Sequence, residues 1–158
     1  MMALSTGIRR TTITTRKMDE SLRFYRDTLG FRVWYDQVVD DPIITRLLGV
    51  EPGVSARVCI LRAEEDHEAG MIGLMEFKGR DTQDLPATGS VAPLAGEIIL
   101  MLKTERMKEI HQRLKNAGLG HVGEPERIEI PNRPMTYEMA TRDPNGVRVT
   151  FVQFGPLE

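Results

Sequence analysis

The chain has 158 residues, of which 41% are hydrophobic and 28% are charged, with a formal net charge of −2. This composition is typical of a globular protein and fits one compact domain or two small modules. Because no basic run is present, nucleic acid and an anionic membrane surface are not expected partners. The longest apolar run, Ile98 to Leu102, is too short to cross a bilayer. The single cysteine, Cys59, excludes an internal disulfide, and the amino-terminal residues lack a signal-peptide core, so a cytoplasmic location is expected.

The first half of the chain begins with a threonine-rich segment, residues 8–16, that favours a strand. An amphipathic helix is predicted next, because apolar residues recur at helical spacing on one face: Met18, Leu22, Tyr25 and Leu29. Asp19 is the expected N-cap of this helix and Gly30 its expected C-cap. The later part of this half predicts a strand from Phe31, one or two helical turns within residues 40–53, and strands over residues 56–62 and 71–78.

The second half follows a stretch rich in Gly, Pro, Ser and Thr, which predicts a linker over residues 80–95. A strand is expected over residues 97–103, and a helix over residues 105–117 with Thr104 as N-cap and Gly118 as C-cap. Three further strands are expected over residues 127–130, 136–141 and 147–154. Both halves therefore read as a βαβββ unit, which predicts an α+β fold of two modules, residues 1–79 and 96–158.

Two motifs resemble those of a known family. Residues 20–31 read ESLRFYRDTLGF, and residues 142–153 read RDPNGVRVTFVQ. With the internal repeat, they resemble the vicinal oxygen chelate superfamily, the group of glyoxalases, bleomycin resistance proteins and extradiol dioxygenases. The resemblance implies two βαβββ modules that form a half-open barrel with outer helices around a small-molecule pocket. It implies little about the reaction, because one fold supports many chemistries.

The same resemblance often implies a divalent metal held by one side chain from each of four strands, usually His, Glu, His or Gln, and Glu. In this sequence those four positions fall on Arg10, Glu76, Glu97 and Thr150. Arginine has no lone pair to give to a metal, and threonine is a poor neutral ligand for zinc, nickel or iron. We therefore expect no cofactor. A divalent metal remains the alternative, if these positions are misplaced by a register slip in the first strand.

Strand alternation predicts which side chains reach the concave face of each module. If Leu100, Met75 and Val149 lie under the helices, then their sequence neighbours point into the concavity. This predicts a polar cluster of Arg10, Thr12, Glu76, Glu97, Arg148 and Thr150. Two strand aromatics, Trp34 and Tyr137, are further candidates for contact with a substrate. Within the cluster, an ion pair between Arg10 and either Glu97 or Glu76 is expected in place of a metal.

Structural roles compete with these functional interpretations. Glu76 and Glu97 are equally well explained as partners of arginines, because buried carboxylates are usually paired. Strand aromatics more often belong to a core or a dimer interface than to a site. His67 is expected at the surface and His111 at a helix surface or an interface, which leaves His121 as the one histidine kept as a pocket candidate.

Two classes of function stay open for an unidentified small organic molecule. In the first, the protein is a lyase, isomerase or dioxygenase relative in which Glu76 or Glu97 is a general base and Arg10 stabilises an oxyanion. In the second, it is a binding protein that sequesters its ligand without catalysis, as bleomycin resistance proteins do. An aromatic and apolar cleft favours binding, and convergent carboxylates favour chemistry. A homodimer is also expected, because the apolar segment from Ile43 to Val50 belongs to neither module.

Overall fold

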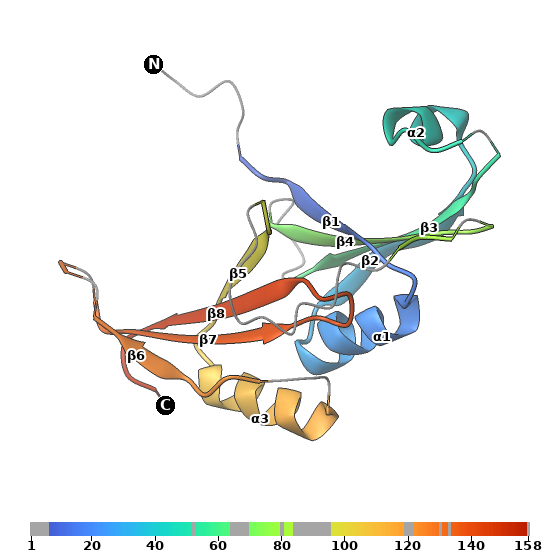
Figure 1. Ribbon diagram of the computed structural model, residues 1–158. Coiled ribbons are helices and arrows are strands. Elements are labelled where there is room, and N and C mark those ends of the chain that lie inside the picture. The colour runs from blue at the N-terminus through green and yellow to red at the C-terminus, as the bar shows by residue number, and fades with distance from the viewer. Residues whose placement is uncertain are drawn as a thin grey trace, which may run out of the picture. The chain divides into compact units, whose positions relative to one another are not determined.

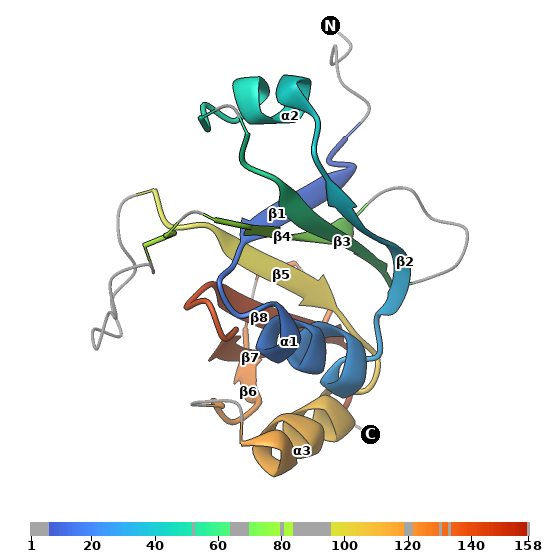
Figure 2. The ribbon, with the colours of Figure 1, turned by 90° about the vertical axis from the view of Figure 1, so that its right-hand side faces the viewer.

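The computed structural model describes residues 7–51, 53–63, 70–79, 81–83, 96–118, 122–129, 131–132 and 134–157, with only the backbone for residues 43–45. The chain divides into two compact units, Met1–Asp84 and Leu85–Glu158, and the boundary lies within the expected linker. Each unit contains one four-stranded sheet (Figures 1 and 2). His67 and His121 lie outside the described residues. None of the described helices is long and apolar enough to cross a membrane.

The first unit is a mixed sheet with strand order β1-β4-β3-β2, in which β1 runs parallel to β4 and the other neighbours are antiparallel. A helix starts as α-helix and continues as π-helix before it ends near Gly30, where φ is +84°. The elements of this unit are β1 (Arg10–Thr14), α1 (Met18–Leu22), η1 (Arg23–Thr28), β2 (Arg32–Val39), α2 (Pro42–Leu47), β3 (Ala56–Arg62) and β4 (Met71–Phe77).

The second unit repeats this topology with strand order β5-β8-β7-β6, again with one parallel pair, β5 and β8. Its elements are β5 (Ile99–Lys103), α3 (Met107–Ala117), β6 (Glu126–Ile128), β7 (Thr136–Arg142) and β8 (Arg148–Phe154). The predicted α+β fold of two βαβββ modules is therefore confirmed. The short helix expected within residues 40–53 is α2, between β2 and β3.

The continuous helix of α1 and η1 begins in the same way as α3, and neither begins as the sequence predicted. Asp19 is not the N-cap of α1 and Thr104 is not the N-cap of α3, because Lys17 and Arg106 occupy those positions. Instead, a threonine hydroxyl two residues earlier accepts the cap residue's N–H: Thr15 Oγ1 from Lys17 at 2.8 Å, and Thr104 Oγ1 from Arg106 at 2.9 Å. The threonine-rich strand end is thus the start signal of each helix. Gly118 is a left-handed C-cap with φ of +63°, as predicted.

The helix of the first unit covers one face of its sheet. The Thr15 hydroxyl lies 3.2 Å from that of Ser21 in α1, so the face that carries Thr15 and Ile13 is the helix side. The register places Cys59, Leu61 and Leu74 on this face, and all three are fully buried. Burial raises the pKa of the Cys59 thiol to about 11, which keeps it protonated and unreactive at neutral pH. Cys59 is therefore a core residue.

A bidentate ion pair joins β2 to β3 on the helix side. Arg57 donates to Asp36 from Nε at 2.9 Å and from Nη2 at 2.8 Å, and its Nη1 lies 3.8 Å from Asp19 of α1. The Arg57 hydrogen bond holds the pKa of Asp36 below its usual value. Because the two side chains are 30% and 31% exposed, solvent screens part of this attraction.

Asp36→Asn should lower the free energy of unfolding by about 1 kcal/mol at pH 7. A carboxyl whose pKa is lower in the folded protein stabilises the fold above the ordinary aspartate pKa of about 4. That stabilisation is lost as the pH falls through the folded-state pKa. Urea unfolding of both proteins at pH 7 and pH 3 should show the difference shrinking in acid.

The matched control is Asp27→Asn, which removes a carboxylate that pairs with its chain neighbour Arg26 and is 50% exposed. This variant should be less destabilised, because its ion pair joins no separate strands and is better screened. Equal losses in the two variants, or a difference that does not change with pH, would contradict the role given to the Asp36–Arg57 pair.

Candidate functional site

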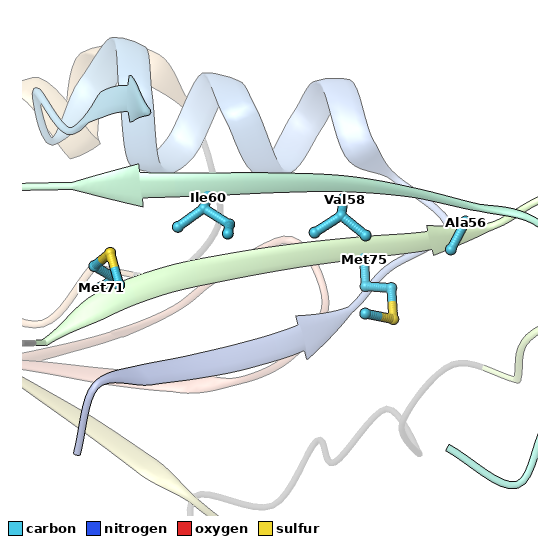
Figure 3. Packing of buried hydrophobic residues seen from close by; sticks show 5 residues of the cluster. All are labelled: Ala56, Val58, Ile60, Met71 and Met75. Atoms are coloured by element: carbon cyan, nitrogen blue, oxygen red, sulfur yellow. The ribbon is translucent and has the colours of Figure 1, made fainter. Parts of the chain in front are cut away.

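The face of the first sheet away from α1 carries the candidate residues of this unit. In the parallel pairing of β1 with β4, Arg10 lies beside Met71, Thr12 beside Gly73, and Thr14 beside Met75. Paired residues share a face, so Arg10 and Thr12 lie on the same side as these β4 positions. Val58 and Ile60 of β3 extend on this side, away from the helix (Figure 3). This face is called the open face below.

The open face contains a hollow of about 560 Å³, lined by Ile8, Arg9, Arg10, Thr12, Trp34, Tyr35, Ile60 and Met71. Ile60 and Met71 also belong to a buried apolar cluster with Ala56, Val58 and Met75, which extends the hollow's floor along β3 and β4 (Figure 3). The predicted site residues Arg10, Thr12 and Trp34 are therefore brought together. No aspartate or glutamate is among the lining residues that the structure describes.

A bulge in β2 places two adjacent aromatic residues on this hollow. The pairing of β2 with β3 shifts register between Val33 and Tyr35, so Trp34 is the extra residue. In a regular strand, Trp34 and Tyr35 would point to opposite faces, but a bulge lets both reach the same side. Trp34 is held from one side by Arg62, whose guanidinium carbon lies 4.0 Å from the centre of the indole ring. The alternation of side chains along a regular strand does not reveal a bulge, so the sequence did not predict that Trp34 and Tyr35 share a face.

Gly73 makes room for the two polar residues of β1. A Cβ atom at this position would lie 2.7 Å from Thr12 Oγ1, which is too short for a real contact, and 3.0 Å from Arg10 Cδ, which is tighter than most. The Arg10 side chain therefore lies over the β4 backbone at Gly73, where its Nε donates to Thr12 Oγ1 at 3.0 Å. Gly73 was missed in the sequence, although a lone glycine inside a strand pattern is a recognised sign of close approach.

Glu76 is not part of this face, so the placement predicted from alternation is wrong. Its cross-strand partner is Arg57, which points to the helix side, whereas the expected helix-side residues Met75 and Phe77 lie on the open face. The Glu76 carboxylate instead contacts Lys78. The prediction failed because both faces of β4 are apolar, and the hydrophobic pattern MIGLMEF does not specify which face is covered.

In the second unit, three predicted residues share the sheet face away from α3: Glu97, Arg148 and Thr150. Gln153 accepts from the Met107 backbone N–H at 3.0 Å, so Gln153 and the residues two and four before it face α3. Arg148 and Thr150 therefore lie on the other face. Glu97 Oε1 accepts from Arg148 Nε at 3.3 Å and from Arg142 Nη1 at 2.9 Å. The carboxylate is thus engaged by two arginines of its own unit.

Tyr137 and Arg142 lie at positions that the sequence did not predict. Tyr137 pairs with Gln153, so the register puts it on the α3 side, opposite Arg148 and Thr150. In the sequence, Arg142 was noted only as the first residue of the motif RDPNGVRVTFVQ. Its direct partner across the ladder is Arg148, which places it in the charged group with Glu97. Its position at the end of a strand, next to a tight turn, gave no signal of this role.

The residues at the four expected ligand positions do not fit a divalent metal. Arg10 can only donate hydrogen bonds, Glu76 lies on the helix side, and the Glu97 carboxylate is bonded to two guanidinium groups. Thr150 offers only a hydroxyl. Within the described part of the chain, no group of three or more His, Cys, Asp or Glu side chains is arranged to hold a metal ion.

Gly73→Ala should lower the free energy of unfolding by about 1–2 kcal/mol, because its methyl group displaces the Thr12 hydroxyl and the Arg10 side chain. The expected cost should fall in a Thr12→Ala background, where the nearest clashing atom is gone. A double-mutant cycle measured by urea unfolding tests this coupling. If the costs of the two substitutions simply add, Thr12 does not determine the need for glycine at position 73.

Comparison with known proteins places the chain in a family. The sequence matches the Glyoxalase/Bleomycin resistance protein/Dioxygenase superfamily over residues 7–151. A search of curated protein sequences found no match. Among solved structures, a glyoxalase family protein from Bacillus cereus has 17% identity and a TM-score of 0.76, with 99% of this chain and 100% of that chain covered.

Two further structures share the fold but differ in their described roles. TnmS3, an antibiotic binding protein from Streptomyces sp. CB03234, has 17% identity and a TM-score of 0.58, with 98% of this chain and 100% of that chain covered. Lactoylglutathione lyase from Agrobacterium tumefaciens has 17% identity and a TM-score of 0.54, with 96% of each chain covered. The match over residues 7–151, together with the two βαβββ units, shows that this chain belongs to the glyoxalase, bleomycin resistance protein and dioxygenase superfamily.

Proposed function

We propose that this protein binds a small, flat organic molecule with a negatively charged group in the hollow of the first unit, without converting it chemically. The main support for this proposal is the set of residues that line the hollow. Trp34, Tyr35 and Ile60 offer aromatic and apolar surface, while the charged side chains at the hollow, Arg9 and Arg10, are both cations. Ligand sites typically combine such apolar walls with a few polar groups that orient the ligand.

The aromatic pair supports a flat ligand. Arg62 lies against the Trp34 ring and restricts its orientation, so a ligand that stacks beside it meets a surface that is already ordered. Stacked or edge-on aromatic contacts add about 0.5–1.5 kcal/mol beyond the area they bury. The Arg10 guanidinium, oriented by Thr12, supplies a donor for a carboxylate or similar group.

Acid–base catalysis has weaker support. Glu76 lies on the helix side of its sheet, and the Oε1 atom of Glu97 already accepts from two arginines. A general base needs a lone pair directed at the proton it removes. The shared fold leaves both classes open, since it occurs in an antibiotic binding protein and in a lyase. The contacts of the two carboxylates favour binding.

Binding can be followed directly, because Trp34 is the single tryptophan of the chain. Titration with 2-naphthoate should change the Trp34 fluorescence in a saturable way, with a dissociation constant below about 1 mM. The uncharged 2-naphthamide should bind about tenfold more weakly, because it lacks the charge that Arg10 attracts. Arg10→Gln should remove this preference without abolishing the fluorescence change.

Val38→Ala is the matched control, since Val38 is 61% exposed on the same strand but pairs with Arg57 on the helix side. This variant should bind 2-naphthoate like the wild type. An unsaturable change in fluorescence, or equal affinity for the acid and the amide, would refute the proposed site.

The proposal includes no divalent metal. Elemental analysis of protein purified without chelator should therefore find zinc, nickel, iron and manganese well below one ion per chain, because Arg10 can only donate hydrogen bonds and the Glu97 carboxylate is bonded to two guanidinium groups. Stoichiometric metal that survives dialysis would show that other residues of the chain form the ligand set.

A further inference from the structure

The turn between β7 and β8 contains the only Asn-Gly pair in the sequence. Residues 142–146 read RDPNG, and the other two asparagines of the chain precede an alanine and an arginine. Because glycine has no side chain to shield its backbone nitrogen, that nitrogen can approach the side-chain amide of the preceding residue closely. Asn145, followed by Gly146, is therefore the asparagine of this sequence that is chemically most prone to deamidation.

Asp143 holds the Asn145 side chain in the folded turn. Its Oδ2 atom accepts from Asn145 Nδ2 at 3.0 Å, and its Oδ1 atom accepts from the backbone N–H groups of Asn145 and Val147 at 2.9 and 2.8 Å. Asp143 is only 4% exposed, so little water competes for these hydrogen bonds. The side-chain amide of Asn145 is thus directed at a buried carboxylate, and its rotation is restricted.

The backbone nitrogen that would attack this amide is held as well. The Gly146 N–H donates to the Asp143 carbonyl at 3.0 Å, and the Gly146 carbonyl accepts from Arg142 Nη1 at 2.6 Å. The nitrogen must lose its proton to attack, and a hydrogen bond from that proton disfavours the loss. The reacting atoms must also come within about 3–3.5 Å with their orbitals aligned. The folded turn instead engages both reacting groups with Asp143.

We propose that Asn145 is a deamidation site that the folded turn protects and that reacts when the turn between β7 and β8 opens. In the reaction, the Gly146 nitrogen gives up its proton and bonds to Asn145 Cγ, the Cγ–Nδ2 bond breaks, and the side-chain nitrogen leaves as ammonia. Water then opens the cyclic imide at either carbonyl, which leaves aspartate or isoaspartate at position 145. This modification does not depend on the function proposed for the first unit.

The modified turn loses the hydrogen bonds that protected it. With aspartate at position 145, a carboxylate replaces the amide that donates to Asp143 Oδ2, and two carboxylates at this separation repel each other. Isoaspartate adds one carbon to the backbone before Gly146, which displaces the groups that bond to Asp143 and Arg142. Either product weakens the turn, so one opening event can cause a lasting loss of stability.

Peptide mapping by mass spectrometry tests the protection on the full chain, incubated at mildly alkaline pH in buffer and in concentrated guanidinium chloride. Asn145 should deamidate at least about tenfold more slowly in the folded protein, because misplaced reacting groups lose most of their reactivity. Asn116, which precedes Ala117 in α3 and accepts from Gln112, is the internal control and should lag behind Asn145 in the denaturant. Equal rates for Asn145 in the two solvents, or equal rates for the two asparagines in the denaturant, would overturn the proposal.

Substitution of Asp143 tests whether this residue provides the protection. In Asp143→Ser, the hydroxyl can still accept a backbone N–H of the turn, but no second oxygen remains for Asn145 Nδ2. Deamidation of the folded variant should therefore be at least about fivefold faster than in the wild type. An unchanged rate would overturn the proposal.

If Asp143→Ser does not fold, two substitutions at position 145 decide the question. Asn145→Asp and Asn145→Ser both remove the Nδ2 donor, but only the first places a carboxylate beside Asp143. The urea midpoint of Asn145→Asp should therefore be lower than that of Asn145→Ser, because like charges repel at this separation. Equal midpoints would show that Asp143 does not hold the side chain at position 145 and would overturn the proposal.

Discussion

The parallel pairing of the first and last strand of each module is the constraint on which both candidate surfaces depend. In a strand, side chains alternate between faces, so the register of one pair decides the face of every residue along both strands. Pairing of Arg10 with Met71 assigns Arg10 and Thr12 to the open face and Glu76 to the helix side. Pairing of Ile99 with Arg148 similarly assigns Arg148 and Thr150 to the face away from α3. A shift of the strand register by one residue would move the core residues to the outer face and the candidate site residues to the helix side.

Most of the fold could be predicted from the sequence, because two strong local signals repeat. Helical spacing from Met18 to Tyr25 and from Met107 to Leu114 marks residues that are buried in the structure. Strand boundaries such as those of β3 agree with the alternation and turn residues, and Gly118 ends α3 as expected. The predicted N-caps were wrong because the hydroxyls of Thr15 and Thr104, two residues before each cap residue, accept the N–H of that residue.

The site was less predictable, since it depends on features without a local sequence period. Alternation works where one face is polar, so it placed Arg148 and Thr150 correctly, but it failed on β4, where both faces are apolar. The bulge at Trp34 brings Tyr35 to the hollow, and the composition of the sequence does not indicate that bulge. Gly73 and Arg142 act through contacts with distant residues, which a single sequence does not show. The homodimer and the cytoplasmic location expected from the sequence stay predictions.

The two modules show how one topology supports two kinds of surface. Equivalent strands supply both, yet the open face of the first sheet carries Trp34, Ile60 and Met71, while the second carries Glu97, Arg142 and Arg148. Backbone pairing fixes positions and directions, and it sets no requirement on the chemistry of side chains that point away from the helix. The helix-covered faces have no such freedom, because residues such as Leu74 and Phe151 must exclude water. Duplicated modules can therefore keep their cores alike while their other faces diverge in charge and shape.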